Sequence, residues 1–380
     1  MEKKFILNGW KLKFFPFLAC ILIAPAIPAQ ELAFSNYITN TFFSYHNTNS
    51  SISLVSGVKN IVEVQDLKAT TKDSISLQPV GYKQLKTVSI AKGKLKTVFI
   101  DNNDLAPNHR KGYSGIAELY HSNQDSNVFV PSFSGFNLEH IFNGESPVPL
   151  FEPRLNPVYL YQKSETEILL YQKPTPVSAA ESLIEFKLVA PYYIDFTFHC
   201  VLHDKKYSQH DYVGFFFASY INKPFDRNIY FQGIADNQSN QSDARLVAAY
   251  SEKHGLKSTH RSIKDKYNFY FAPDFRVTLA NHFSDYRYTE PFFFGRFQNM
   301  ALAYFFEPSE LIRFSQSPDG GGIGNPAWDF YYIIPQPKME QEYTFKGRIV
   351  YKPFTNAKDI NREYKKWMKN RQAFFVLYLF

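Results

Sequence analysis

Cysteine is scarce in this sequence, with two in 380 residues, Cys20 and Cys200. Cys20 lies in an apolar stretch near the start that we expect to be removed, which leaves Cys200 alone. One cysteine excludes an internal disulfide. The folded chain must therefore be held by its core, and a chain of this length can bury a large one in a single domain or in two.

The first 29 residues have the pattern of a secretory signal peptide. Four lysines precede the apolar stretch "FFPFLACILIAPAIPA", which ends in a small-residue site around Ala26 to Ala29. We expect residues 1–29 to be the signal, the mature chain to begin near Gln30, and the protein to be exported to the periplasm or the extracellular space. Phe17 stands where a lipoprotein signal has an aliphatic residue, so lipidation of Cys20 is not predicted.

Strong charge and long apolar runs are also missing from the mature chain. The formal net charge is +7, and loss of residues 1–29 takes away four lysines and one glutamate, which lowers it by three to +4. This charge is too mild to indicate a nucleic-acid partner. No 18-residue apolar segment follows the signal, so we expect no integral membrane helix.

Several motifs of common enzymes are absent. No Gly-x-Ser-x-Gly elbow and no His-Glu-x-x-His pair occurs, and the glycines of "SPDGGGIGNPAW" are not followed by Lys-Ser or Lys-Thr. The stretch "FHCVLHDKKYSQHD" holds His199, His203 and His210, but strand residues four apart are separated by about 13 Å. We therefore predict neither a metal site nor a cofactor.

Short alternating runs rich in aromatic residues fill most of the chain. "LKTV" occurs at Leu85–Val88 and at Leu95–Val98, which predicts a β-hairpin that turns near Gly93. Similar runs continue through "EILLYQK", "SLIEFKLVA" and "YYIDFTFHCVL". We predict an all-β fold, a large antiparallel two-sheet (super)sandwich with few short helices, over residues 51–355 and after an extended lead-in over residues 30–50.

Residues 356–380 are predicted to form a helix and then a strand. In "NAKDINREYKKWMKN" an apolar face is made by Ile360, Tyr364, Trp367 and Met368. The run "AFFVLYLF" over 373–380 is apolar on both faces of a strand, which favours a buried closing strand over a barrel wall.

Three stretches combine His, Arg, Glu, Tyr and Asn with aromatic residues: "PNHRKGYSGIAEL", "FNLEHIFNG" with "FEPR", and "NHFSDYRYTEPFFFGRFQNM". Sugar-binding clefts use this mixture for hydroxyl hydrogen bonds and ring stacking. From these stretches we take as candidate catalytic residues His109, Tyr113, Glu139 and His282, and as candidate substrate-binding residues Asn137, Arg154 and Arg296.

Glu139 and His140 are adjacent, so the direction of each side chain decides which of them can line a cleft. On a straight strand they point in opposite directions, so Asn137 and Glu139 would line a cleft while His140 would enter the core with Phe136, Leu138 and Phe142. We expect His140 to be a hydrogen-bonded core residue. A bulge in the strand would exchange the faces.

The segment from "GYSGIAEL" through "FSGFNLEHIFNG", "FEPR", "APYYIDFTFHC" and "YVGFFFASYINKP" resembles secreted bacterial proteins with a galactose-mutarotase-like β-supersandwich. The resemblance spans about residues 105–355. In that superfamily a long curved sheet forms a concave carbohydrate cleft, and members include aldose epimerases and polysaccharide lyases. Epimerases use a His acid and a Glu base, and the resemblance does not assign these two roles to particular residues of this chain.

The resemblance implies a secreted protein that binds or modifies a glycan in a concave cleft, with a carbohydrate as its partner. An enzyme of this kind would be an epimerase or a lyase. In a lyase, a Tyr or His takes the proton beside a uronic-acid carboxylate and an Arg neutralises that carboxylate. The alternative is a non-enzymatic envelope or surface protein, in which the apolar run 373–380 adds a strand to a partner's sheet.

Overall fold

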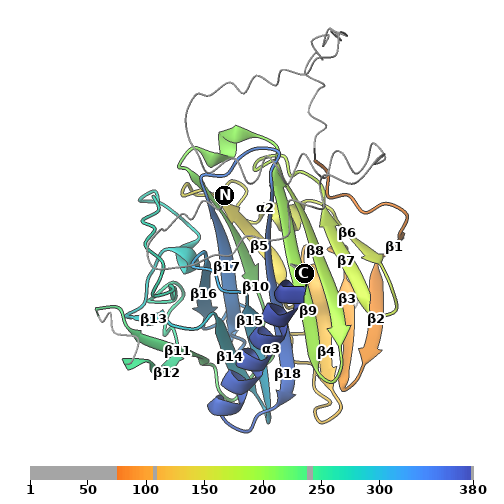
Figure 1. Ribbon diagram of the computed structural model, residues 1–380. Helices are drawn as coiled ribbons and strands as arrows, with labels where there is room; N and C mark the ends of the chain where they lie inside the picture. The colour runs from red at the N-terminus through yellow and green to blue at the C-terminus, as the bar shows by residue number, and fades with distance from the viewer. Residues whose placement is uncertain (1–74, 106–108, 238–242, 378–380) are drawn as a thin grey trace, which may run out of the picture. The chain divides into compact units, whose positions relative to one another are not determined.

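The computed structural model describes residues 75–105, 109–237 and 243–377 (Figure 1). The predicted signal peptide, the predicted lead-in and residues 51–74 of the predicted sandwich lie outside the described residues. From residue 75 onward the chain is mainly strand, and the paired strands are antiparallel. The all-β prediction is therefore confirmed.

Eleven strands form the largest sheet. Ten follow one another in the order β1 (Lys83–Leu85), β6 (Val158–Gln162), β7 (Glu167–Gln172), β8 (Ala180–Val189), β9 (Tyr193–Leu202), β18 (Glu342–Pro353), β15 (Met300–Phe306), β14 (Phe292–Phe297), β11 (Ile229–Ala235) and β12 (Arg245–Ala249). The short β13 (Tyr286–Tyr288) pairs with β11.

Two smaller sheets make up the rest. One has the order β16 (Ile312–Ser317), β17 (Ala327–Pro335), β10 (Tyr212–Ala218) and β5 (Asn137–Phe142), and the other the order β2 (Thr87–Lys92), β3 (Leu95–Ile100) and β4 (Gly115–His121). Backbone hydrogen bonds between Ile116 and Gly135 join β4 to the residues before β5. We expected two sheets. Three are found, because the bridge between Ile116 and Gly135 is too short to join β4 and β5 in one continuous ladder.

The predicted hairpin is confirmed by the pairing of β2 with β3, which ends at Lys92 opposite Leu95. Gly93 takes a φ of +62° in its turn. A Cβ atom at this position would lie 2.5 Å from the carbonyl oxygen of Pro191. The turn thus needs glycine both for its backbone angle and for the close approach of another segment.

One hydrophobic core lies between the large sheet and the two smaller ones. The ring of Phe136 lies 5.1 Å from that of Phe186 in β8 and 5.1 Å from that of Phe217 in β10. The opposite face of the four-stranded sheet, here called the outer face, carries Phe216 and Tyr331 in a second cluster. Loop segments cover this outer face, so both faces of the small sheet are buried.

Within the described residues the helices are α2 (Glu152–Leu155), α3 (Ala357–Leu377) and the 3₁₀ turns η1 (Lys205–Ser208) and η3 (Thr278–Ala280). The apolar face predicted for α3 is confirmed, since Ile360, Tyr364 and Trp367 are buried in one cluster with residues of β14, β15 and β18. In Figure 1 the helix lies in front of these strands. No helix in the described part of the chain is long and apolar enough to cross a membrane.

The closing strand expected over residues 373–380 is wrong for residues 373–377, because α3 continues through Leu377. Once a helix is established, each further residue adds a backbone hydrogen bond, so propagation costs little. Residues 378–380 lie outside the described residues. The alternative in which this run adds a strand to a partner's sheet is therefore not supported over residues 373–377.

A polar network fastens α3 to the sheet. The Lys352 ammonium contacts Asp359 at 2.8 Å and Glu363 at 3.1 Å. The hydroxyls of Tyr192 and Tyr193 donate to the two oxygens of Glu363. Burial acts to raise the pKa of Glu363, but the hydrogen bonds from Tyr193, Tyr192 and Lys352 outweigh it and lower that pKa.

Because the pKa of Glu363 is lower in the folded chain than in the unfolded one, Glu363 stabilises the fold above its unfolded pKa of about 4.3. This stabilisation is lost as the pH falls through the folded pKa. We expect the melting temperature of Glu363→Gln to depend less on pH than that of the wild type between about pH 5 and pH 3. Thermal melts over this range measure the difference, and parallel pH profiles would contradict the assignment.

Candidate functional site

A β-bulge in β5 determines on which face of the sheet the side chains of Glu139 and His140 lie. Opposite β10, His140 pairs with Phe216 and Leu138 pairs with Phe217, so Glu139 is an extra residue in the ladder. Two residues then oppose one, and the side chains on either side of the extra residue no longer alternate. The Nε2 atom of His140 lies 3.6 Å from Oε1 of Glu139. Both side chains of the pair thus lie on the outer face.

The face predicted for His140 was therefore wrong, although its burial was predicted correctly. Phe136 and Leu138 belong to the central core, whereas Phe142 belongs to the cluster on the outer face. His140 is 6% exposed and is stacked on Phe151, with ring centroids 4.8 Å apart. The bulge explains the error, because a simple alternation of faces does not include an extra residue.

Arg154 of α2 joins the candidate residues into one cluster. Its Nε donates to Oδ1 of Asn137 at 3.0 Å, and its Nη2 lies 3.0 Å from Oε1 of Glu139. Nη2 also donates to the hydroxyl of Tyr220, which donates in turn to Oε2 of Glu139 at 2.8 Å. The guanidinium lies 4.2 Å from the ring centroid of Tyr113. Four predicted residues, Tyr113, Asn137, Glu139 and Arg154, thus meet in space.

Gly112 lets the chain pass close to Arg154. It has a φ of +97°, and a Cβ atom there would lie 3.3 Å from Cβ of Arg154. Its neighbour Tyr113 is held by His109, whose Nε2 donates to the Tyr113 carbonyl oxygen. Burial lowers the pKa of His109. His109 therefore positions the cluster through the backbone of Tyr113.

The protonation states of Glu139 and His140 follow from their surroundings. Burial acts to raise the pKa of Glu139, but Arg154 and the Tyr220 hydroxyl contribute to a net lowering, so Glu139 is ionised at neutral pH. Burial lowers the pKa of His140 and keeps the ring neutral. Its Nδ1 contacts the Leu150 carbonyl oxygen at 2.7 Å, and a carbonyl only accepts, so Nδ1 carries the proton. Nε2 then has a free lone pair beside Glu139.

Asp329 of β17 also belongs to the outer face, and sequence reasoning missed it. Its neighbours Trp328 and Phe330 enter the central core, so Asp329 points the opposite way. Oδ1 accepts from the backbone N–H of Ser219 at 3.1 Å, and Oδ2 has no hydrogen-bond partner among the described residues. Burial, and then the charge of Glu139, raises the pKa of Asp329 well above its usual range.

A lone acidic residue in the apolar run "AWDFYYIIP" was the sequence signal for Asp329, since an unpaired carboxyl is rarely buried without a role. Tyr220, in "FFFASYINKP", had no comparable signal. Its hydroxyl meets Glu139 only because β10 pairs with β5.

His254 lies near the cluster, in the residues between β12 and β13 that cover the outer face, here called the covering segment. Its Nδ1 lies 3.2 Å from Oγ of Ser317, and it interacts electrostatically with Glu139. The predicted residue His282 supports this segment, because its Nδ1 donates to the carbonyl oxygen of Gly255. His282 thus lies one step away from the cluster and acts on it through the backbone beside His254.

Arg296, in contrast, lies among other residues. It stands on β14, where its Nη1 is 4.0 Å from Oδ2 of Asp226 and its guanidinium lies between the rings of Phe225 and Phe354. The structure does not bring it to the Glu139 cluster.

No group of three or more His, Cys, Asp or Glu side chains in the described residues is arranged to hold a metal ion. The three histidines considered in the sequence each contact different carboxylates: His199 contacts Glu342, His203 contacts Glu181 and Glu340, and His210 contacts Glu145.

A depression of about 140 Å³ on the large sheet is separate from the cluster. Its lining includes charged residues of β7, β8 and β9. Of these, Lys187 pairs with Glu167 at 2.7 Å, and Asp195 pairs with Arg348 of the neighbouring β18 at 2.5 Å. Because these charges already neutralise one another, the depression offers a ligand little unpaired charge.

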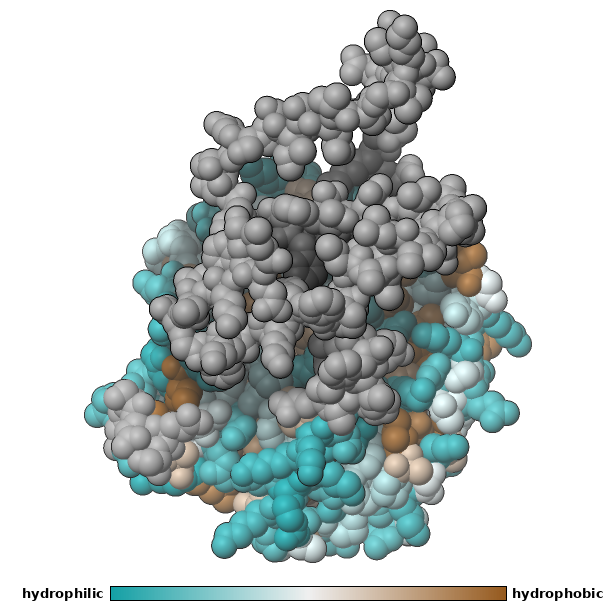
Figure 2. All heavy atoms as spheres, viewed as in Figure 1, coloured by the Kyte–Doolittle hydropathy of each residue, from teal (hydrophilic) through white to brown (hydrophobic). Residues whose placement is uncertain are grey.

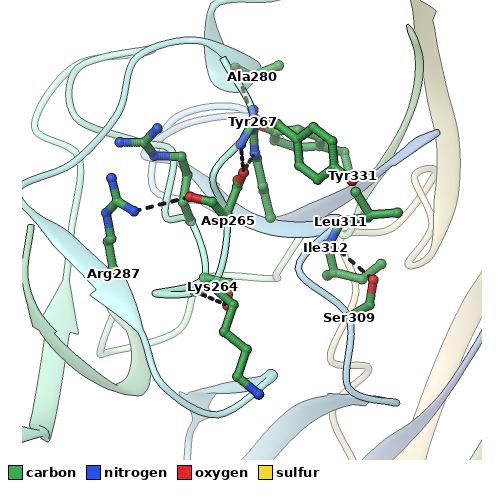
Figure 3. A network of polar contacts seen from close by, with 12 residues as sticks. Lys264, Asp265, Tyr267, Ala280, Arg287, Ser309, Leu311, Ile312 and Tyr331 are labelled. Atoms are coloured by element: carbon green, nitrogen blue, oxygen red, sulfur yellow. Dashed lines mark hydrogen bonds and ion pairs between the residues drawn. The ribbon is translucent and has the colours of Figure 1, made fainter. Parts of the chain in front are cut away.

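A buried ion pair fastens the covering segment to the outer face (Figure 3). Nε of Arg313, in β16, donates to Oδ2 of Asp265 at 2.7 Å, and both side chains are 1% exposed. The backbone N–H of Tyr267 donates to Oδ1 of Asp265 at 3.0 Å. Nearby, the hydroxyl of Tyr331 donates to the carbonyl oxygen of Ala280. These contacts hold residues 265–280 against β16 and β17.

Comparison with known proteins gives structural likenesses alone. No family model matches the sequence, and no curated protein matches it. An aldose 1-epimerase candidate from Escherichia coli K12 is similar over 70% of this chain and 99% of its own, with 11% identity and a TM-score of 0.42. At this identity and TM-score the likeness assigns neither a family nor an activity to this chain.

Two other solved structures are similar over part of their length. The heparan sulfate lyase HepC from Pedobacter heparinus matches over 69% of this chain and 34% of its own, with 8% identity and a TM-score of 0.35. A 4-alpha-glucanotransferase from Thermococcus litoralis matches over 72% and 39%, with 8% identity and a TM-score of 0.32. This chain therefore spans about a third of the lyase, and these values assign no reaction to it.

Removal of the charge at Asp265 should destabilise the fold strongly. Asp265→Asn leaves the buried Arg313 cation uncompensated, and loss of one partner of a buried pair costs about 3–5 kcal/mol. The matched control is Asp285→Asn, since Asp285 pairs with Lys257 at a surface site where both side chains are more than 60% exposed. The control should cost about 1 kcal/mol or less. Urea denaturation measures both, and equal losses would contradict the assignment.

Proposed function

We propose that this protein binds a carbohydrate at the Glu139–Arg154 cluster and modifies it by proton transfer. The observation that carries the proposal is the bulge at Glu139, which brings a carboxylate and an imidazole together beside a guanidinium. Amide, hydroxyl and carboxylate groups recognise sugar hydroxyls, and aromatic rings stack on sugar faces. Asn137, Tyr220 and the ring of Tyr113 supply such groups in the cluster.

The charge around the cluster favours an acidic sugar. Glu139 balances Arg154, and a second guanidinium, that of Arg110, lies 5.2 Å from the ring of Tyr113 and 4.9 Å from that of Phe133. Arg110 is exposed. A ligand carboxylate could pair with Arg110 at little cost, since no buried partner would be displaced. Glu139 and Arg154 are 13% and 11% exposed, and this exposed part is where a ligand would first make contact.

The cluster has groups suited to give and to take a proton. Nε2 of His140 has a free lone pair and can act as a base, and Asp329, whose pKa is raised well above its usual range, can act as an acid. Neighbouring groups whose surroundings drive their pKa values apart are the usual basis of acid and base roles. Glu139 would stabilise the imidazolium that forms when His140 takes a proton.

Two reaction classes fit these roles. In epimerisation, the base takes the proton of the anomeric hydroxyl. The hydroxyl oxygen then forms a carbonyl with the anomeric carbon while the bond from that carbon to the ring oxygen breaks. The acid protonates the ring oxygen. In lyase chemistry, the base takes the proton beside a uronic-acid carboxylate, a carbon–carbon double bond forms, and the departing glycosidic oxygen takes the proton of the acid. Each step moves one proton to His140 and one from Asp329.

Binding to a glycan array, followed by an absorbance assay for unsaturated products on uronic-acid polymers, tests the proposal. Anomer exchange of simple sugars, followed by NMR, tests the epimerase reaction. We expect binding to at least one acidic glycan and turnover in one of the two assays. An absence of glycan binding would contradict the proposal, and binding without turnover in either assay would contradict its proton-transfer part.

The substitution Asp329→Asn tests whether Asp329 acts as the general acid or has only a structural role. Asparagine has nearly the same shape and no charge, as does protonated Asp329, so we expect the melting temperature and glycan binding to stay close to the wild type. Turnover should fall by about 10²–10⁴-fold, because general acid catalysis contributes this much. Asp285→Asn, at the exposed pair, is the control and should keep full activity. Wild-type turnover in Asp329→Asn would exclude it as the acid.

We also propose that the protein is exported, with residues 1–29 as a cleaved signal peptide. The support is the lysine-rich start, the apolar stretch and the small residues that follow it. Mass spectrometry of the protein from the periplasm or the medium should give a chain that begins near Gln30. Recovery of the uncleaved chain in the cytoplasm would contradict this.

A further inference from the structure

Helix α3 carries a row of basic side chains on the side away from the sheet. Its exposed cations are Lys358, Arg362, Lys365, Lys366 and Lys369. Their spacing of four, three, one and three residues keeps them on one helical face. At 1.5 Å per residue the row is about 17 Å long. We call this row the basic stripe. Figure 2 shows hydrophilic side chains over the lower part of α3 in that view.

Among the residues of the basic stripe, only Arg362 is paired with an acidic residue of α3. Asp359 and Glu363 both contact Lys352 of β18, and Glu363 also accepts from two tyrosines of the sheet. Arg362 pairs with Asp359 at 2.9 Å. The four lysines form no ion pair within the part of the chain that the structure describes. The stripe therefore presents four uncompensated positive charges.

The apolar face of the same helix section is already occupied. Ile360, Tyr364 and Trp367 are buried against the sheet, so this section cannot insert its apolar face into another partner. Attachment through residues 358–369 would thus be electrostatic. The sequence continues with the apolar run "AFFVLYLF" at 373–380, directly after the stripe.

We propose that the basic stripe of α3 binds the surface of a bilayer that contains anionic lipids. A straight row of lysines on the outward side of a docked helix fits a flat anionic surface. A polyanionic glycan is the other partner with matching charge, and the heparin measurement below separates it from a bilayer. The proposal is independent of the chemistry at Glu139, which lies on a different sheet.

Sedimentation of the full chain with vesicles tests the proposal. The vesicles are pure phosphatidylcholine, or phosphatidylcholine mixed with phosphatidylglycerol, at low and at high salt. The test variant changes Lys358, Lys365, Lys366 and Lys369 to Gln. The control variant makes the same change of net charge on β1 to β3, with Lys83, Lys86, Lys92 and Lys94 changed to Gln, all of which are exposed. Both variants alter solvent-facing side chains, so their melting temperatures should match the wild type.

We expect the wild type to bind the phosphatidylglycerol vesicles more tightly than the neutral ones, and less tightly as salt rises. Each basic residue near an anionic bilayer strengthens binding about fivefold, so the stripe variant, which loses four, should bind on the order of 600-fold more weakly. The control should stay within about threefold of the wild type. Equal losses in both variants would overturn the proposal, and so would stripe-dependent capture by heparin without vesicle binding, which would assign the stripe to a polyanionic glycan.

Discussion

The ion pair between Arg154 and Glu139 is the interaction on which the outer face of the four-stranded sheet depends. A nearly buried carboxylate is tolerated only when a charge and hydrogen bonds compensate it. Arg154 and Tyr220 together satisfy both oxygens of Glu139, and Asn137 satisfies the Nε of Arg154. The bulge in β5, the short helix α2 and the close passage at Gly112 are all arranged around this pair.

The two faces of the small sheet have different compositions. The inner face is apolar and joins the central core, and the one cysteine of the described residues, Cys200, is free, so no disulfide supports this part of the chain. The outer face combines rings such as Phe216 and Tyr331 with buried polar groups, and the pair of Arg313 with Asp265 holds its cover in place. Helix α3 follows a related division, because its apolar side is docked on the large sheet and its lysines face outward.

Much of the fold was predictable from short-range patterns. The β2–β3 hairpin and the buried face of α3 at Ile360, Tyr364 and Trp367 follow from local periodicity and turn residues. The motifs also pointed to Tyr113, Asn137, Glu139 and Arg154, because polar and aromatic residues cluster there along the chain. The face of His140 and the length of α3 were predicted wrongly. A bulge and the extension of a helix depend on the partner strand and on propagation, and alternation within one segment reports neither.

The sequence by itself determined the all-β class, the strand segments and the residue types from which a sugar site could be built. It did so because side-chain periodicity and turn chemistry act over a few residues. The tertiary structure alone decided that Glu139 and His140 share a face, that Tyr220 and Asp329 join them, and which of these groups carries a proton. The order β17, β10, β5 brings together residues 190 positions apart, Glu139 and Asp329. A pKa depends on burial and on neighbouring charges, and both exist only after that pairing has formed.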